Sequence, residues 1–210
     1  MPPKRYIQRD LPVPYITRWE RETVIHPEVV VAHGPQGPHL GFADESFYDR
    51  DSFGVLWVRQ AIQRGRGRAR FEEVHALRQR RAMLDLLCQI CGIPMFEADR
   101  QLYVVTDAGG TPIREGELTT SPPVCRTCAP DAIRYCPRLR AGHAAAWVRQ
   151  SSGWGVEAFL YHPKTLRRIS PEPRRIPYED PRAQWAVAFR SVVILRGCTP
   201  VNIADLASQS

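Results

Sequence analysis

The sequence lacks any long hydrophobic run. No stretch approaches the ~18 consecutive apolar residues that a membrane-spanning helix needs. The first six residues are not followed by the apolar segment of about 7 to 15 residues that a secretory signal peptide requires. We therefore expect a cytoplasmic protein with no membrane partner, in which cysteine thiols stay reduced.

The sequence also lacks the common catalytic signatures. It contains no Gly-x-Ser-x-Gly elbow, no P-loop, no HExxH pair and no dinucleotide-binding fingerprint. It shows no internal repeat that would indicate a solenoid or a propeller. The absence of these catalytic motifs favours a function of binding over one of catalysis.

Lysine is almost absent. Of the 29 cationic side chains only Lys4 and Lys164 are lysines, and the others are arginines. Arginine binds phosphate through two parallel hydrogen bonds, but a GC-rich gene would give the same excess without any function. The chain has 210 residues and a net charge of +7, so it suits one domain or two small ones with a substantial core. Where the arginines lie therefore matters more than how many there are.

The excess positive charge is concentrated between residues 59 and 81, which contain eight arginines and only two acidic residues. A flexible loop of arginine and glycine can follow a phosphate backbone, and each neutralised phosphate adds salt-dependent affinity. A solvated loop, or docking on an acidic protein surface, explains the same charges. The candidate nucleic-acid-binding residues are Arg64, Arg66, Arg68, Arg70, Arg78 and Arg81.

Two Cys-x-x-Cys pairs indicate a metal site. Cys88 and Cys91 form the first pair, and Cys125 and Cys128 form the second pair after a spacer of 33 residues. Two such turns can direct four thiolates at one ion, and an all-sulfur tetrahedral site favours Zn²⁺. Unrelated buried cysteines or a redox pair are the alternatives. Four protein ligands leave no open coordination position, so we expect the zinc to be structural.

Two cysteines and a group of histidines lie outside this quartet. Cys136 is expected to be buried at a corner between helices and is the substitute ligand, whereas Cys198 is expected to pack in the core. A weaker candidate for a second metal site lies around the Gly/Pro-rich loop of residues 34–41, and its members are His26, His33 and His39.

A knuckle, a predicted hairpin in the spacer and a second knuckle that opens a helix resemble the treble-clef zinc finger. HNH endonucleases with this module need a histidine base and further metal-binding side chains. No histidine lies between Cys91 and Cys125, and His143 is the only one in the predicted helix that follows. A diverged metal-dependent nuclease is therefore the least favoured function. The stretch 80–143 is also similar to small actinobacterial zinc-knuckle proteins, and this resemblance implies no activity.

We predict an α+β fold in which small β-elements and helices surround the treble-clef-like four-cysteine zinc module. Residues 1–14 contain four prolines and are expected to form an extended arm. Strands are predicted over residues 23–25, 29–31, 54–58, 102–105 and 154–161. Helices are predicted over residues 71–87, 129–135 and 139–148. Asp180 as an N-cap and Gly197 beyond the end indicate a C-terminal helix, although residues 191–195 are equally compatible with a strand.

Three regions are expected: a β-rich N-terminal region of residues 1–58, the basic helix with the zinc module in residues 59–150, and a C-terminal strand and helix in residues 151–210 that pack on the same body. The predicted function is that of a non-catalytic, zinc-stabilised binding protein with a nucleic-acid-associated or regulatory role and DNA or RNA as its partner. An adaptor that binds an acidic protein is the alternative.

Overall fold

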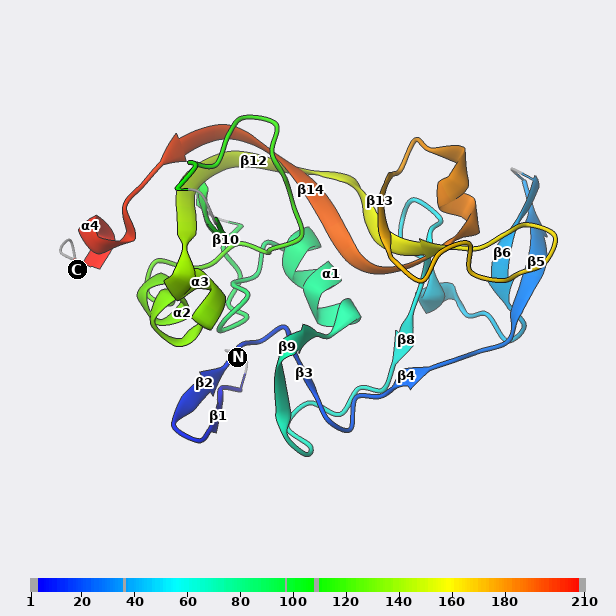
Figure 1. Cartoon of the computed structure of the whole chain (residues 1–210), viewed down its shortest axis with the longest axis horizontal. Coiled ribbons are helices and arrows are strands. Elements are labelled where there is room, and N and C mark those ends of the chain that lie inside the picture. The colour runs from blue at the N-terminus through cyan, green and yellow to red at the C-terminus, as the bar shows by residue number, and fades with distance from the viewer. Residues whose placement is uncertain (1–3, 36, 97, 108–109, 208–210) are drawn as a thin grey trace.

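The computed structural model describes residues 4–35, 37–96, 98–107 and 110–207. Two long antiparallel strands, β12 (His143–Leu160) and β14 (Ala186–Pro200), cross most of the molecule as a curved ribbon (Figure 1). The pairing register shifts between Gly153 and Gly155, and such bulges bend and twist a strand. A Cβ atom at Gly155 would lie 2.0 Å from the carbonyl oxygen of Ile176, so only glycine fits there.

Four shorter strands complete a six-stranded sheet around this ribbon. At one end β10 (Gln101–Thr106) pairs with β12, and β11 (Leu118–Thr119) pairs with β14. At the other end β13 (Arg174–Pro177) pairs with β12, and β7 (Leu56–Trp57) pairs in parallel with β14. The N-terminal region therefore contributes a strand to the same sheet as the C-terminal region.

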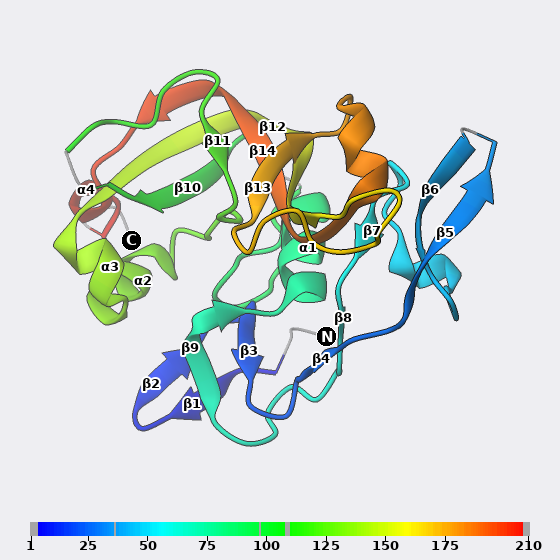
Figure 2. The same cartoon turned by 45° about the vertical axis from the view of Figure 1, so that its right-hand side comes forward.

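Other strands of the first 74 residues form two-stranded sheets. The hairpins are β1 (Tyr6–Gln8) with β2 (Leu11–Val13), and β5 (Val29–Gly34) with β6 (Gly37–Phe42). The long-range pairs are β3 (Thr17–Trp19) with β9 (Ala69–Val74), and β4 (Val24–Ile25) with β8 (Arg59–Gln60). Strand pairing thus joins residues 17–25 to residues 59–74, and the two segments run beside each other in Figure 2.

Four α-helices and two short 3₁₀ helices lie among the described residues. They are α1 (Ala76–Leu84), α2 (Ala129–Tyr135), α3 (Pro137–Ala141), α4 (Ile203–Ala207), η1 (Phe47–Asp49) and η2 (Pro181–Trp185). Helix α1 is tied to the sheet by the buried Gln79, whose amide nitrogen donates to the carbonyls of Thr120 and Ser191. No helix within the described residues is long and apolar enough to cross a membrane.

The mixed α+β class is confirmed, and so is the helix over residues 129–135 with its restart at Pro137. The helix predicted over residues 71–87 is wrong in its first part, because residues 69–74 form β9 and pair with β3. The helix predicted over residues 139–148 is also wrong beyond α3, because residues from 143 onward belong to β12.

Three further predictions need correction. The helix predicted between Asp180 and Gly197 is limited to the 3₁₀ helix η2, with Asp180 as its N-cap, whereas the alternative strand over residues 191–195 is confirmed as part of β14, which also contains Gly197. The hairpin expected inside the spacer between the cysteine pairs is not formed among the described residues, because β10 pairs with β12 instead. Conversely, two segments expected to be irregular contain paired strands: residues 6–13 of the supposed arm form a hairpin, and β6 occupies most of the Gly/Pro-rich loop of residues 34–41 and pairs with β5, which includes the strand predicted over residues 29–31.

Candidate metal centre

The first cysteine pair lies in a tight turn that follows α1. The Cys88 N–H donates to the carbonyl of Ile93 at 2.9 Å, and the Gly92 N–H donates to the carbonyl of Cys88 at 2.7 Å. Gly92 has a φ of +74°, which favours a residue without a Cβ atom. The turn folds back on itself, so Cys88 and Cys91 lie on the same side of it.

The second cysteine pair opens α2. The N–H groups of Cys128 and Ala129 both donate to the carbonyl of Cys125, at 3.0 and 3.1 Å. Cys128 is the N-cap residue of α2, and Pro130 occupies the first turn, where the missing N–H costs no hydrogen bond. The start of the helix therefore fixes the position of the second pair.

These two turns bring the four sulfur atoms together. The Sγ atoms of Cys88, Cys91, Cys125 and Cys128 all lie within 4.8 Å of one another. The Sγ atoms of Cys91 and Cys125 are 3.9 Å apart, whereas the sulfur atoms of a zinc tetrahedron with bonds of about 2.3 Å are about 3.8 Å apart. A disulfide needs about 2.05 Å, and all four cysteines are free. The predicted ligands therefore form a cluster that can hold a metal ion, and its dimensions fit Zn²⁺.

The four thiols also change one another's pKa. A hydrogen bond with the Cys128 thiol lowers the pKa of Cys125 to about 7. Hydrogen bonding to Cys125 lowers the pKa of Cys91 as well, but it raises the pKa of Cys88 and Cys128. A metal ion binds the thiolate form of each ligand, so binding releases the remaining protons and its affinity falls as the pH decreases.

An apolar cluster surrounds the cysteines. Cys88, Cys91 and Cys128 are buried and Cys125 is half-buried. The cluster draws its side chains from four elements that are distant in the sequence, β10, α2, β12 and α4; among them are Leu102, Val104, Ala129, Ala145, Ile203 and Leu206. A bound ion would therefore hold together the end of the molecule at which α2, α3 and α4 lie (Figure 1).

The remaining candidate ligands are not brought to this cluster. Cys136 is the C-cap residue of α2, and the thiol of Cys198 in β14 lies 3.6 Å from the carbonyl of Arg114. His33 and His39 lie in the hairpin of β5 and β6, where His39 contacts the carbonyl of Gly37. Within the residues that the structure describes, the four cysteines are the only group of three or more side chains placed to share an ion.

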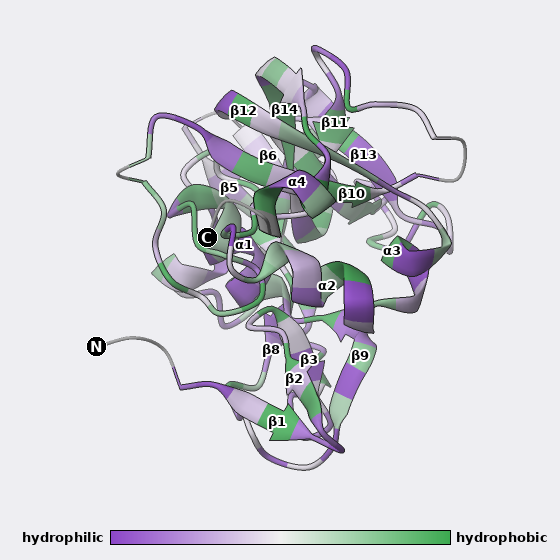
Figure 3. Cartoon of the chain, turned by 90° about the vertical axis from the view of Figure 1, so that its left-hand side faces the viewer, coloured by the Kyte–Doolittle hydropathy of each residue, from purple (hydrophilic) through white to green (hydrophobic). Residues whose placement is uncertain are grey.

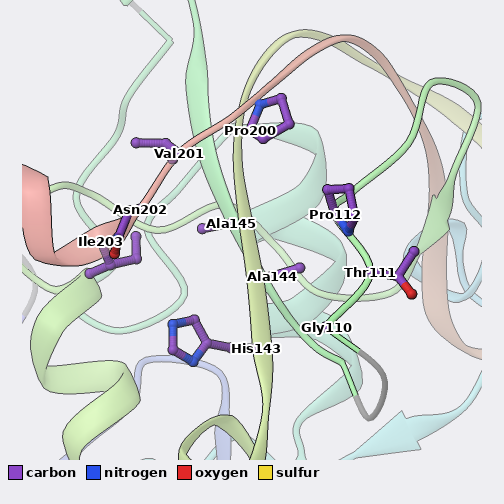
Figure 4. Close-up of a pocket in the computed structure, with 10 residues that line it drawn as sticks. All are labelled: Gly110, Thr111, Pro112, His143, Ala144, Ala145, Pro200, Val201, Asn202 and Ile203. Carbon is purple, nitrogen blue, oxygen red and sulfur yellow. The ribbon is translucent and has the colours of Figure 1, made fainter.

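A hollow of about 380 Å³ opens beside the apolar cluster, with Ala145 and Ile203 common to both (Figure 4). His143 is exposed in it, and its Nδ1 lies 3.0 Å from the carbonyl of Leu139. Among the described residues that line this hollow, His143 is the only histidine, cysteine or acidic residue. The lining thus offers one imidazole to a metal ion and no second ligand.

The structure removes Arg78 from the candidate nucleic-acid-binding residues. Its side chain is buried, and two guanidinium nitrogens donate to the carboxylate of Glu22 at 2.6 Å each. A third hydrogen bond reaches the carbonyl of Thr17 at 2.7 Å. Glu22 is itself fully buried, so this pair is an internal link between β9–α1 and the segment after β3.

The other five candidates differ in the exposure of their guanidinium groups and in whether these groups form ion pairs. Arg64 is half-buried, with its guanidinium 5.0 Å from the ring centre of Tyr6 and 4.9 Å from that of Tyr15. Arg70 and Arg81 are exposed and form ion pairs, with Glu20 at 3.2 Å and Asp85 at 3.5 Å. Arg66 and Arg68 are exposed, and no ion pair within the described residues involves either of them.

Sequence reasoning missed Arg9 and Gln8, which the structure places beside Arg68 and Arg70 in a second hollow. Gln8 is the last residue of β1, and Arg9 is the first residue of the turn that connects β1 to β2. The available signal for this hairpin was a pair of short, largely apolar segments, Tyr6-Ile7-Gln8 and Leu11-Pro12-Val13. They flank two residues that can form a turn, Arg9 and Asp10. Four nearby prolines concealed this signal, because proline is unusual within paired strands.

No protein-family model matches this chain, and no curated protein or solved structure matches it either. The resemblances to the treble-clef finger and to actinobacterial zinc-knuckle proteins are therefore not confirmed by any relative. Locally, the second knuckle opens a helix as in a treble clef, but β10 pairs along its length with β12 and meets the rest of the described spacer at an isolated bridge between Leu102 and Val124.

Proposed function

We propose that this chain is a non-catalytic, zinc-stabilised protein that binds nucleic acid through the loop and strand of residues 66–70. The observation that carries the proposal is the exposure of Arg66 and Arg68, which have no carboxylate partner among the described residues. Positive charge that no neighbouring acid neutralises is the feature a phosphate backbone recognises. Zinc bound by four thiolates has no open position, so its role in this proposal is structural, in a module of the treble-clef type.

Residues 64–68, which precede β9, form a loop that we call the arginine loop, and backbone hydrogen bonds hold it in place. Gly65 and Gly67 have φ values of +84° and +79°, and the turn between them places Arg66 at the tip. The Glu20 N–H donates to the carbonyl of Arg68 at 2.8 Å, and the carboxylate of Glu20 accepts from the Arg68 N–H at 3.2 Å. These bonds use the backbone and leave the guanidinium groups of Arg66 and Arg68 to the solvent, so little ordering is needed on binding.

The metal centre is connected to this loop through β3. In the first knuckle, the carbonyl of Ile90 accepts from the Tyr15 N–H at 2.8 Å and that of Gln89 accepts from the Ile16 N–H at 3.3 Å. Strand β3, which begins at the next residue, Thr17, pairs with β9, which follows the arginine loop directly. Zinc at the knuckle therefore stabilises the segment against which the loop is held.

Binding is tested with fluorescently labelled DNA and RNA by anisotropy, beginning at about 50 mM salt. The double variant Arg66→Ala/Arg68→Ala should weaken binding and reduce the slope of log K against log salt by about 2, because each lost phosphate contact contributes about 0.9. The matched control is Arg167→Ala/Arg174→Ala, which removes the same charge from exposed positions near β13 and should change the slope far less.

Two outcomes would overturn the proposal. One is the absence of binding to any nucleic acid at about 50 mM salt. The other is equal weakening by both double variants, which would mean that only the net charge matters. Recovery of an acidic protein that survives nuclease treatment and depends on Arg66 and Arg68, without nucleic-acid binding, would replace the proposal with the adaptor function.

A further inference from the structure

A hollow of about 290 Å³ lies against the arginine loop, between the β1–β2 hairpin and β9. These strands lie side by side at the base of the molecule, and β9 carries hydrophilic segments there (Figures 2 and 3). The hollow is lined by Gln8, Arg9, Leu11, Arg68, Ala69, Arg70, Phe71 and Glu72. It is distinct from the metal centre and from the hollow that contains His143.

The charge of this hollow suits an anion. The lining contains three arginines, Arg9, Arg68 and Arg70, and a single acidic residue, Glu72. Arg70 also pairs with Glu20, but both side chains are 45% exposed, and exposed ion pairs of this kind are weak. A phosphate group can therefore replace Glu20 as the partner of Arg70.

The turn that carries Arg9 is an unusual place for an arginine. Arg9 and Asp10 have φ values of +51° and +61°, and they connect β1 to β2. Two-residue hairpin turns with positive φ at both positions favour Asn-Gly or Asp-Gly, because a side chain is disfavoured in that conformation. Glycine would relieve the strain at position 9, whereas arginine brings a third cation to the rim of the hollow.

The lining also contains groups that suit a nucleobase. Phe71 is 42% exposed although it belongs to a strand, and an exposed aromatic ring is a platform on which an unpaired base stacks. The Oε1 atom of Gln8 accepts from the Ala69 N–H at 2.8 Å, which fixes the amide and leaves its NH₂ group as a donor. Cations, a ring and an amide donor in one hollow match the phosphate, face and edge of a nucleotide.

We propose that this hollow holds one nucleotide of a single-stranded nucleic acid, with the phosphate among the three arginines and the base against Phe71. The proposal rests on the proposed function and adds the class of substrate to it. A base in a duplex is stacked on both faces and paired along its Watson–Crick edge, so it offers no free face to Phe71. Single strands should therefore bind more tightly than duplexes of equal length.

The first test compares a labelled single-stranded oligonucleotide with the blunt duplex of the same sequence by anisotropy at one salt concentration. The single strand should bind about tenfold more tightly or better. Phe71→Ala should remove most of that preference and leave duplex binding unchanged. The matched control is Phe96→Ala, which removes another exposed ring, 63% accessible, beyond the first knuckle, and should change neither affinity.

The second test separates a binding role of Arg9 from a structural one. Arg9→Gly relieves the backbone strain of the turn, so the melting temperature should hold or rise while single-strand affinity falls severalfold. Unchanged affinity in this variant would overturn the assignment of Arg9.

Failure of this inference differs from failure of the proposed function. Equal binding of single strand and duplex, both weakened by Arg66→Ala/Arg68→Ala and neither affected by Phe71→Ala, would overturn the nucleotide site and keep the proposed function. Absence of binding to both would overturn the two proposals together.

Discussion

The two ends of this molecule are held together by different chemistry. At the cysteine end, four sulfur atoms that can hold a metal ion lie among apolar side chains from β10, α2, β12 and α4. At the arginine end, guanidinium groups connect segments that are far apart in the sequence, as Arg78 does when it binds Glu22, 56 residues away. A cation that looks available in the sequence is therefore occupied once the fold brings a distant carboxylate to it.

A second arginine, Arg59 in β8, also connects separate segments of the chain. Arg59 forms ion pairs with Asp49 at 2.7 Å and with Asp44 at 2.9 Å, and its guanidinium lies over the ring of Phe42. Its hydrogen bonds are the main reason that the pKa of Asp49 is lowered to about 2. Arg59 therefore ties the segment around η1 to β8 and to the buried ring of Phe42.

Loss of the metal should have the largest effect on stability. Chelation, or the substitution Cys88→Ser, should lower the melting temperature by about 10 °C or more, because structural zinc contributes several kcal/mol and each kcal/mol shifts a protein of this size by about 2–4 °C. Thermal melting followed by circular dichroism, together with elemental analysis for stoichiometric metal, checks this.

The matched control for that experiment is Cys198→Ser, which changes a cysteine outside the quartet and should shift the melting temperature by only about 1–3 °C. A metal-free protein that melts at the same temperature as the loaded one would remove the contrast between the two ends.

The buried ion pair should come second. Arg78→Met leaves the carboxylate of Glu22 buried without its partner, which costs about 3–5 kcal/mol. Arg81→Met, on the same helix, breaks only the exposed pair with Asp85 and should cost less than about 1 kcal/mol. Urea unfolding of both variants measures the difference, and equal costs would show that burial does not decide the strength of these pairs.

The smallest of these effects depends on pH. Burial, followed by the charge of Arg78, lowers the pKa of His75 to about 4. The unfolded chain takes up a proton at about pH 6.5 whereas the folded protein does not, so stability is lost as the pH falls through this interval. Between pH 7 and pH 5 the loss should be about 2 kcal/mol.

His75→Gln should remove this contribution. Urea unfolding of wild type and variant at pH 7, 6 and 5 measures it, and the difference between the two proteins cancels the pH dependence of the metal centre. Parallel curves over that range would mean that protonation of His75 does not oppose folding.

Local signals in the sequence were sufficient for the cysteine end. The spacing of Cys88, Cys91, Cys125 and Cys128 predicted their convergence, because a Cys-x-x-Cys turn needs only a few residues to orient two thiols. Pro130 behind Cys128 marked the start of α2 for a similarly local reason.

Elements whose partners are distant could not be predicted in this way. Ala144, Ala145 and Ala146 favour a helix, yet they form β12 because all three pair with β10 and Ala146 also pairs with β14. Gly197 has the positive φ of a helix C-cap, +64°, but it lies in β14 with the side chain of Arg149 against it. Arg78 is likewise buried because the distant Glu22 pairs with it, and no local sequence pattern around either residue indicates this ion pair.

The position of β14 has a consequence for how the protein is made. Of the strands that the structure describes, β14 is the last to leave the ribosome, yet it lies in the interior of the sheet between β12 and the short strands β7 and β11. Until residues 186–200 have been synthesised, one edge of the 18-residue strand β12 has no partner. Unpaired edges invite association with other chains, so the nascent polypeptide is the form most in need of a chaperone.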